Sequence, residues 1–116
     1  MSNTPLGNTH ALMDMLGYLA ITIDARAKGD GERSYTMSLL EKGALHSGKK
    51  IAEEGAELAI ALAAQSEEES ALEAADLLYH VLVGLRAKGV SLDQVAEALR
   101  QRQGISGLDE KASRQR

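Results

Sequence analysis

The apolar positions of this chain recur at helical spacing, and no stretch alternates with the period of two that strands show. One apolar stripe follows residues 8 and 9, which are good helix N-caps, and it consists of Leu12, Leu16, Leu19 and Ile23. A second stripe consists of Ile51, Gly55, Leu58 and Leu62. Both patterns predict amphipathic helices that pack around a shared core.

Capping residues and glycines divide the chain into segments. A charged, Gly-rich turn occupies residues 28–33, and Ser34 then opens a short helix that stops at Gly43. Capping boxes of the form S-x-x-E and S-x-x-Q begin at Ser66 and Ser91. The predicted helices cover residues 8–27, 34–43, 44–64, 66–87 and 91–101.

The composition indicates a core with few large side chains. Hydrophobic residues make up 44 % of the 116 positions, yet there is no Phe or Trp and there are only three Tyr. Such a core gains little from the burial of each side chain, so we expect a second copy to complete it. The expected fold is all-α, with about four to five helices in a helical bundle completed by dimerisation. It forms one domain over residues 1–116, with flexible tails at 1–7 and 104–116.

Charge and residue usage exclude several classes of protein. The net charge is −4, which argues against a basic surface that coats nucleic acid. The absence of Cys excludes disulfides, thiolate catalysis and Cys-ligated zinc. The first ten residues lack the features of a signal peptide, and the longest apolar run, residues 77–85, is about half of what a membrane span needs. We expect a cytoplasmic protein that binds no membrane.

Two pairs of acids stand at mirrored positions around a predicted helical hairpin. Glu54 and Glu57 lie eleven and eight residues before Gln65, and Glu73 and Asp76 lie eight and eleven residues after it. The short connection around Gln65 makes the two helices antiparallel neighbours. Because each pair has i, i+3 spacing, its members project from one face. The four carboxylates are therefore expected at matched heights on facing helices.

The second pair lies in a helix that is apolar on nearly all sides from residue 71 to 85. Glu73, Asp76 and His80 are its main polar interruptions and share one face. Buried carboxylates that repel one another need a neutralising partner. Four oxygen donors without a thiolate suit Mg²⁺ or Mn²⁺, and such a site suits phosphate chemistry. A solvated helix face, or pairing of single acids with lysines, is the alternative.

Four blocks of this sequence resemble a known family. E-E-x-x-E followed by E-x-x-D on the next helix is similar to the signature of the all-α nucleoside triphosphate pyrophosphohydrolases. Within them, the chain resembles the phosphoribosyl-ATP pyrophosphohydrolase family over roughly residues 12–114. The blocks, in the family's order, are SYTMSLLEKG (34–43), KKIAEEGAEL (49–58), EAADLLYHVLVGL (73–85) and ISGLDEKASR (105–114).

The resemblance implies hydrolysis of the α–β phosphoanhydride of phosphoribosyl-ATP, which gives phosphoribosyl-AMP and pyrophosphate in the second step of histidine biosynthesis. It implies dependence on Mg²⁺ and a homodimer or a dimer of dimers. The family's metal-binding carboxylates match Glu54, Glu57, Glu73 and Asp76. Glu53 matches the first acid of the E-E pair and is expected to orient or deprotonate the attacking water. The length indicates the stand-alone hydrolase rather than a fusion with the next enzyme.

Further residues are candidates for substrate binding, each beside a structural alternative. Lys50 and its neighbour Lys49 could hold a substrate phosphate, or Lys50 could pair with Glu53 or Glu54. Tyr35 could stack on a base or ribose, or be a core aromatic.

Three more candidates lie further along the chain. His80 could hydrogen-bond to Asp76 and so orient that acid toward a metal ion, or be an interface histidine. Lys111 and Arg114 could close over the phosphates from the tail, whose composition equally suits disorder without ligand.

Two other functions fit the same residues. One is a housekeeping hydrolase that clears non-canonical nucleoside triphosphates with the same carboxylates. The other is a non-catalytic helical dimerisation module whose acids only solubilise it.

Overall fold

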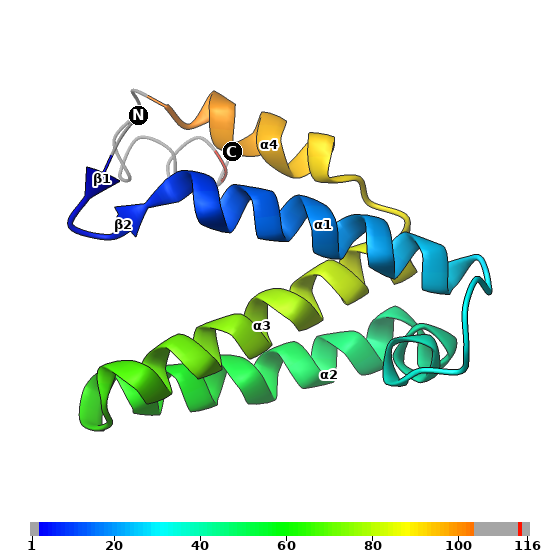
Figure 1. Ribbon diagram of the computed structural model, residues 1–116, viewed down its shortest axis with the longest axis horizontal. Coiled ribbons are helices and arrows are strands. Elements are labelled where there is room, and N and C mark those ends of the chain that lie inside the picture. The colour runs from blue at the N-terminus through cyan, green and yellow to red at the C-terminus, as the bar shows by residue number, and fades with distance from the viewer. Residues whose placement is uncertain (1–2, 104–113, 115–116) are drawn as a thin grey trace.

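Four helices dominate the computed structural model, which describes residues 3–103 and 114 (Figure 1). They are α1 (Thr9–Ala27), α2 (Tyr35–Ala64), α3 (Glu67–Lys88) and α4 (Leu92–Gln101). α2 and α3 form the long antiparallel hairpin expected around Gln65, and α1 crosses it (Figure 1). The all-α fold is thereby confirmed. No helix of the described residues has the length and apolar character of a membrane span.

The predicted helix ends agree with the observed caps. Asn8, Ser34, Ser66 and Ser91 each cap a helix through their side-chain oxygen. The box at Ser91 is complete, because Gln94 also accepts from the Ser91 backbone N–H at 2.9 Å. α3 ends at Gly89, whose left-handed backbone (φ 83°) terminates the helix.

The boundary predicted at Gly43 is a kink inside α2. Gly43 has φ 87° and ψ 176°, a conformation that a residue with a Cβ rarely adopts. The chain therefore turns sharply between a short first segment and the long segment that carries the acids. Counting α2 as two segments gives the five helices predicted from the sequence.

The core is small. Ile23 of α1, Leu39 of α2 and the α3 pair Leu82 and Val83 form its buried cluster. α2 and α3 pack closely at Gly84, where an added Cβ would lie 3.2 Å from the Cβ of Ser47. Any larger residue at that position would push the two helices apart.

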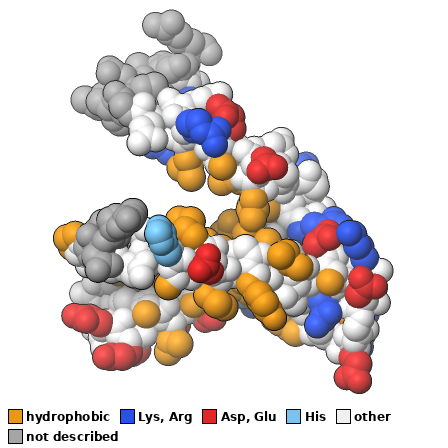
Figure 2. Space-filling model, turned by 45° about the horizontal axis from the view of Figure 1, so that its top comes forward, with side chains coloured by type: hydrophobic (Ala, Val, Ile, Leu, Met, Phe, Trp, Pro, Cys, Tyr) orange, Lys and Arg blue, Asp and Glu red, His pale blue; other side chains and the backbone are white. Residues whose placement is uncertain are grey.

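Two expectations about the apolar pattern are wrong in part. Leu12 is 49 % exposed and Leu62 is 70 % exposed, although both were expected in core stripes. Their helices extend beyond the small area where α1, α2 and α3 meet, so the ends of each stripe have nothing to pack against within this chain. Figure 2 shows hydrophobic side chains that nothing covers, around a hollow on one face of the molecule.

A short hairpin precedes α1. Residues 3–4 (β1) pair antiparallel with Gly7–Asn8 (β2), in a region where the sequence predicted a tail and no strand. Strands of two residues leave no alternation of apolar and polar positions for a sequence pattern to reveal. The predicted tail at 104–116 lies outside the described residues except for Arg114.

Candidate metal centre

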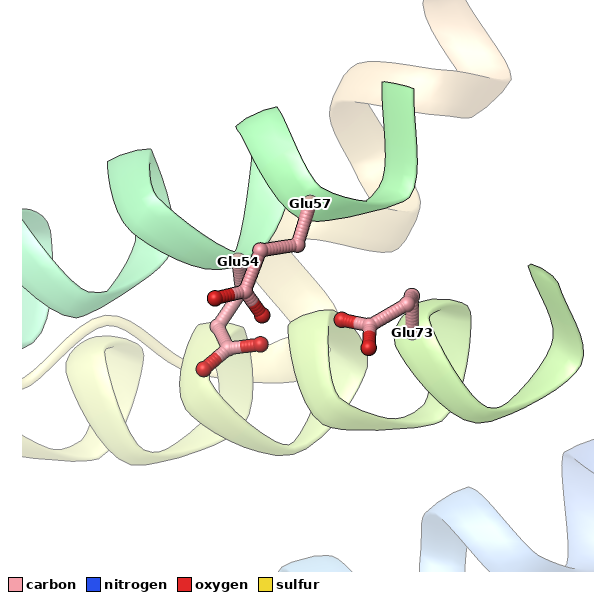
Figure 3. Close-up of side chains that lie close together, drawn as sticks. All are labelled: Glu54, Glu57 and Glu73. Carbon is pink, nitrogen blue, oxygen red and sulfur yellow. The ribbon is translucent and has the colours of Figure 1, made fainter. Parts of the chain in front are cut away.

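Three carboxylates from the two helices of the hairpin converge. Glu54 and Glu57 project from α2 and Glu73 projects from α3, so that their side chains point toward one another (Figure 3). One oxygen from each lies within 4.8 Å of the others. The mirrored spacing around Gln65 thus predicted the meeting of these three side chains. We call them the acid cluster.

Two oxygens of the acid cluster are buried and have no hydrogen-bond partner among the described residues. They are Oε2 of Glu54 and Oε2 of Glu73. A buried acceptor without a partner costs about 1–3 kcal/mol, and more when it is charged. Both atoms therefore favour a positive partner.

Electrostatics in the acid cluster act against ionisation. Burial is the main cause that raises the pKa of Glu54, followed by the charge of Glu57 and a hydrogen bond with it. The pKa of Glu73 is raised chiefly by a hydrogen bond with Glu57, and then by burial and the neighbouring carboxylates. Carboxylates held this close together repel one another, and a bound cation would offset that repulsion.

The fourth expected carboxylate, Asp76, lies outside the acid cluster. Its side chain is exposed, but its charge contributes to the raised pKa of both Glu54 and Glu73. Asp76 is therefore near enough to repel these acids. Its exposure contradicts the expectation that this part of α3 is buried on nearly all sides, and Glu57 on α2 is exposed as well. The edge of the hairpin that carries these two acids is open to solvent within this chain.

The basic and hydroxyl-bearing candidates are spread more widely. Lys50 pairs with Glu53 at 3.6 Å, which is the structural alternative considered from the sequence. Lys49 and Glu53 are exposed. Tyr35 is 58 % exposed at the start of α2, so its role as a core aromatic is excluded and stacking remains a prediction.

Of the two candidates in the C-terminal tail, the structure describes only Arg114. Arg114 lines a cavity of about 420 Å³ together with Val95 and Leu99 of α4 and with Arg102, which follows that helix. Lys111 lies outside the described residues.

His80 is buried, with 6 % of its surface exposed. Its Nδ1 lies 2.8 Å from the backbone carbonyl oxygen of Asp76, whereas the sequence led us to expect the carboxylate. An i, i+4 bond to the carbonyl is available to any helix, and it leaves the Asp76 carboxylate free to face solvent. Nε2 has no partner among the described residues.

The acid cluster fits a divalent cation. All its donors are carboxylate oxygens, which hard cations prefer, and two of them are buried without a partner. A bound cation would satisfy these oxygens and would remove the mutual repulsion that raises the two pKa values. The three carboxylates could therefore hold a metal ion.

Comparison with known proteins decides the family. The family model described as phosphoribosyl-ATP pyrophosphohydrolase matches residues 16–103, which is most of the chain and includes the whole acid cluster. The chain belongs to this family.

Relatives that carry the family's name are similar to this chain over most of its length. Phosphoribosyl-ATP pyrophosphatase 1 of Bradyrhizobium diazoefficiens is 53 % identical over 96 residues, which cover 83 % of this chain and 91 % of the relative. Phosphoribosyl-ATP pyrophosphatase of Caulobacter vibrioides is 53 % identical over 103 residues, which cover 89 % of this chain and 95 % of the relative. A histidine biosynthesis bifunctional protein of Wolinella succinogenes is 47 % identical over 92 % of this chain but 47 % of its own length.

The sequence interpretation missed one residue beside the site of this family member. Ser47 is buried, faces Gly84 across the hairpin, and has no partner for its hydroxyl among the described residues. A signal was present, because these two small residues lie at nearly equal distances from Gln65 on either side. The sequence argument did not use this signal, because it considered only charged residues and the polar interruptions of apolar helices.

Proposed function

We propose that this protein hydrolyses the α–β phosphoanhydride of phosphoribosyl-ATP to phosphoribosyl-AMP and pyrophosphate, the second step of histidine biosynthesis. The observation that carries the proposal is the family match over residues 16–103, together with the acid cluster that lies within the match. The family supplies the substrate, and the cluster supplies a site suited to its chemistry.

Glu54, Glu57 and Glu73 would hold Mg²⁺, or Mn²⁺ in its place, with Asp76 as a fourth ligand from the exposed edge. The cation supplies positive charge that offsets the charge of the pyrophosphate group. The open edge at Glu57 and Asp76 leaves room for the substrate's phosphates to approach the same ion.

Glu53 is proposed to orient or deprotonate the attacking water. Its support is its place next to Glu54 and its exposure to solvent. Water attacks phosphorus, a new P–O bond forms, the bridging P–O bond breaks, and pyrophosphate leaves with its electron pair. The Lys50 ammonium lies 3.6 Å from the Glu53 carboxylate, within reach of the same site.

Substrate binding is proposed for Lys49 and Lys50, which lie one turn before the acids, and for Tyr35, whose exposed ring could stack on the base or ribose. Lys111 and Arg114 are proposed to contact the phosphates. Arg114 lies beside α4 in this structure.

We also propose that the protein works in the cytoplasm as a homodimer, or a dimer of dimers. Large hydrophobic side chains are exposed on every helix, which is unusual for a monomer. Those on α1 and α4 are Leu12, Met13, Met15, Tyr18, Ile21, Leu92 and Leu99. Covering them would complete the small core. Sedimentation equilibrium tests this proposal, and a monomer at micromolar concentration would refute it.

The proposed activity is tested with a panel of substrates. The protein is incubated with Mg²⁺ and either phosphoribosyl-ATP, dATP, dCTP or dUTP, and the release of pyrophosphate is measured. We expect preference for phosphoribosyl-ATP, and loss of that activity in Glu54→Gln. Preference for a deoxynucleotide would identify a housekeeping hydrolase instead, and no turnover of any substrate would indicate a non-catalytic module.

A further inference from the structure

Four buried side-chain atoms of the described residues lack a hydrogen-bond partner, and the acid cluster explains only two of them. Those two are the Oε2 atoms of Glu54 and Glu73, and the others are Ser47 Oγ and His80 Nε2. All four lie on α2 and α3. A buried polar atom without a partner is costly, so the second pair needs its own explanation.

These atoms form one row along the hairpin. Ser47 precedes Glu54 by seven residues and His80 follows Glu73 by seven, so each pair shares a helix face two turns apart. The helices are antiparallel, and Ser47 faces Gly84, one turn beyond His80. His80 therefore lies between the acid cluster and Ser47 along the interface of α2 and α3.

The His80 ring is held rigidly. Nδ1 lies 2.8 Å from the carbonyl oxygen of Asp76, and because that oxygen only accepts, Nδ1 carries a hydrogen. Tyr79 packs edge-on against the ring, with centroids 5.0 Å apart, and its hydroxyl is in turn bonded to Thr36 Oγ1 at 2.6 Å. With its orientation fixed, the ring can use only Nε2 for a further interaction.

Glu54 is the acid that this nitrogen can serve. Glu54 lies eleven residues before Gln65 and Asp76 eleven residues after it, so these two positions lie at matched heights on the antiparallel helices. His80 follows Asp76 by one turn, and both His80 Nε2 and Glu54 Oε2 are buried without a partner among the described residues. Glu73 lies two turns from His80 on the same helix and is the more distant acid. Outer partners of this kind fix the orientation of a ligand and raise metal affinity by about 10–100-fold.

We propose that His80 is a positioning residue whose Nε2 accepts a hydrogen bond from a water that also donates to the Glu54 carboxylate, and so aims that carboxylate at the bound cation. This inference rests on the proposed function, because it assigns a task within the same site. The Nδ1 bond to the Asp76 carbonyl is the anchor, and the Nε2 bond is the positioning contact.

Two isosteric variants separate the anchor from the positioning contact. The amide of His80→Asn can replace Nδ1 but does not reach the Nε2 position, whereas His80→Gln places its amide near Nε2. Titration calorimetry with Mn²⁺ alone, without substrate, gives the metal affinity. We expect the dissociation constant to rise about tenfold in His80→Asn and to stay within about threefold in His80→Gln. His10→Asn, on the exposed surface, is the matched control and should bind as the wild type does.

Wild-type affinity in His80→Asn, or equal losses in both variants, would overturn the proposal, because the ring would then matter only for packing. A second measurement leaves His80 unchanged: in protein with ¹⁵N-labelled histidine, Glu54→Gln should shift the Nε2 resonance of His80 and leave that of His10 in place. An unshifted His80 resonance would also overturn it. A wild type that binds Mn²⁺ but does not hydrolyse phosphoribosyl-ATP would refute the proposed function and leave these results valid.

Discussion

Acids at the two ends of this molecule differ in their surroundings, and their pKa values move in opposite directions. At the end where α1 meets the start of α2, Glu41 accepts two hydrogen bonds from Arg33 at 2.6 and 2.5 Å. Asp24 lies 2.9 Å from both Lys28 and Arg86. Hydrogen bonds from these basic groups lower the pKa of both acids. Each charge here is matched within the chain.

In the acid cluster no such match exists. Burial and neighbouring carboxylates raise the pKa of Glu54 and Glu73, and no ion pair joins either of them to a basic residue in the described part of the chain. The same residue type therefore stabilises the fold at one end and opposes it at the other. Acids that lie close together without a basic side chain to neutralise them are candidates for a functional site.

The largest expected difference between the two regions is in the rate of phosphoribosyl-ATP hydrolysis by their variants. Glu57→Gln removes a carboxylate from the acid cluster, and we expect the hydrolysis of phosphoribosyl-ATP to fall on the order of 10³-fold, because charge on the phosphates is no longer offset. Glu41→Gln removes an equal charge from the matched end and should change the rate less than about twofold. Pyrophosphate release under saturating Mg²⁺ measures both, and similar losses would remove the distinction.

Stabilisation by metal should follow the same division. At a Mg²⁺ concentration of about 100 times the dissociation constant, binding to the folded state adds about 2.7 kcal/mol, which raises the melting temperature of a chain of this size by roughly 10 °C. The double variant Glu54→Gln with Glu73→Gln should lose this increase, and Glu41→Gln should keep it. Thermal melts with and without Mg²⁺ measure this rise in melting temperature. A double variant that kept the rise would show that the cation binds elsewhere.

Without metal, the two ends should respond in opposite directions. Glu54→Gln removes a repelled charge, so the melting temperature in a chelating buffer should rise. Asp24→Asn removes the partner of Lys28 and Arg86, so the melting temperature of that variant should fall. The decrease should be small, because the ion pairs are exposed. A melting temperature that fell in both variants would contradict the account of the acid cluster.

The smallest expected effect is the pH dependence of the metal-free protein. The pKa values of Glu54 and Glu73 are raised above 4.5 in the folded state, so folding binds protons and stability falls as pH rises from about 4.5 through the raised values. Asp24 and Glu41 act at lower pH, because their stabilisation is lost as pH falls through their lowered pKa values. Melts between pH 4 and 8 should show the downward slope in the wild type and a shallower one when both glutamates are Gln.

Most of the fold could be predicted, because its signals are local. Ser34, Ser66, Ser91 and Gly89 mark helix ends through their own hydrogen bonds or backbone conformation, and such marks need no tertiary context. Gly43 was predicted as the end of one helix, with the next beginning at residue 44, and the chain turns sharply at that position.

Less of the site could be predicted, because it depends on how deep each side chain lies. Counting from Gln65 brought Glu57 and Glu73 together correctly, but could not tell that Asp76 faces solvent. The spacing of residues also could not predict that His80 bonds to the Asp76 carbonyl rather than to its carboxylate, because side-chain rotamers decide which oxygen is reached.

The central claim is that the acid cluster is a divalent-cation site, and calorimetric titration of Mg²⁺ into the substrate-free protein tests it most directly. We expect saturable binding in the wild type and in Glu41→Gln, and none in Glu73→Gln, whose buried oxygen has no other partner among the described residues. Binding of Mg²⁺ by Glu73→Gln with wild-type affinity would contradict the claim.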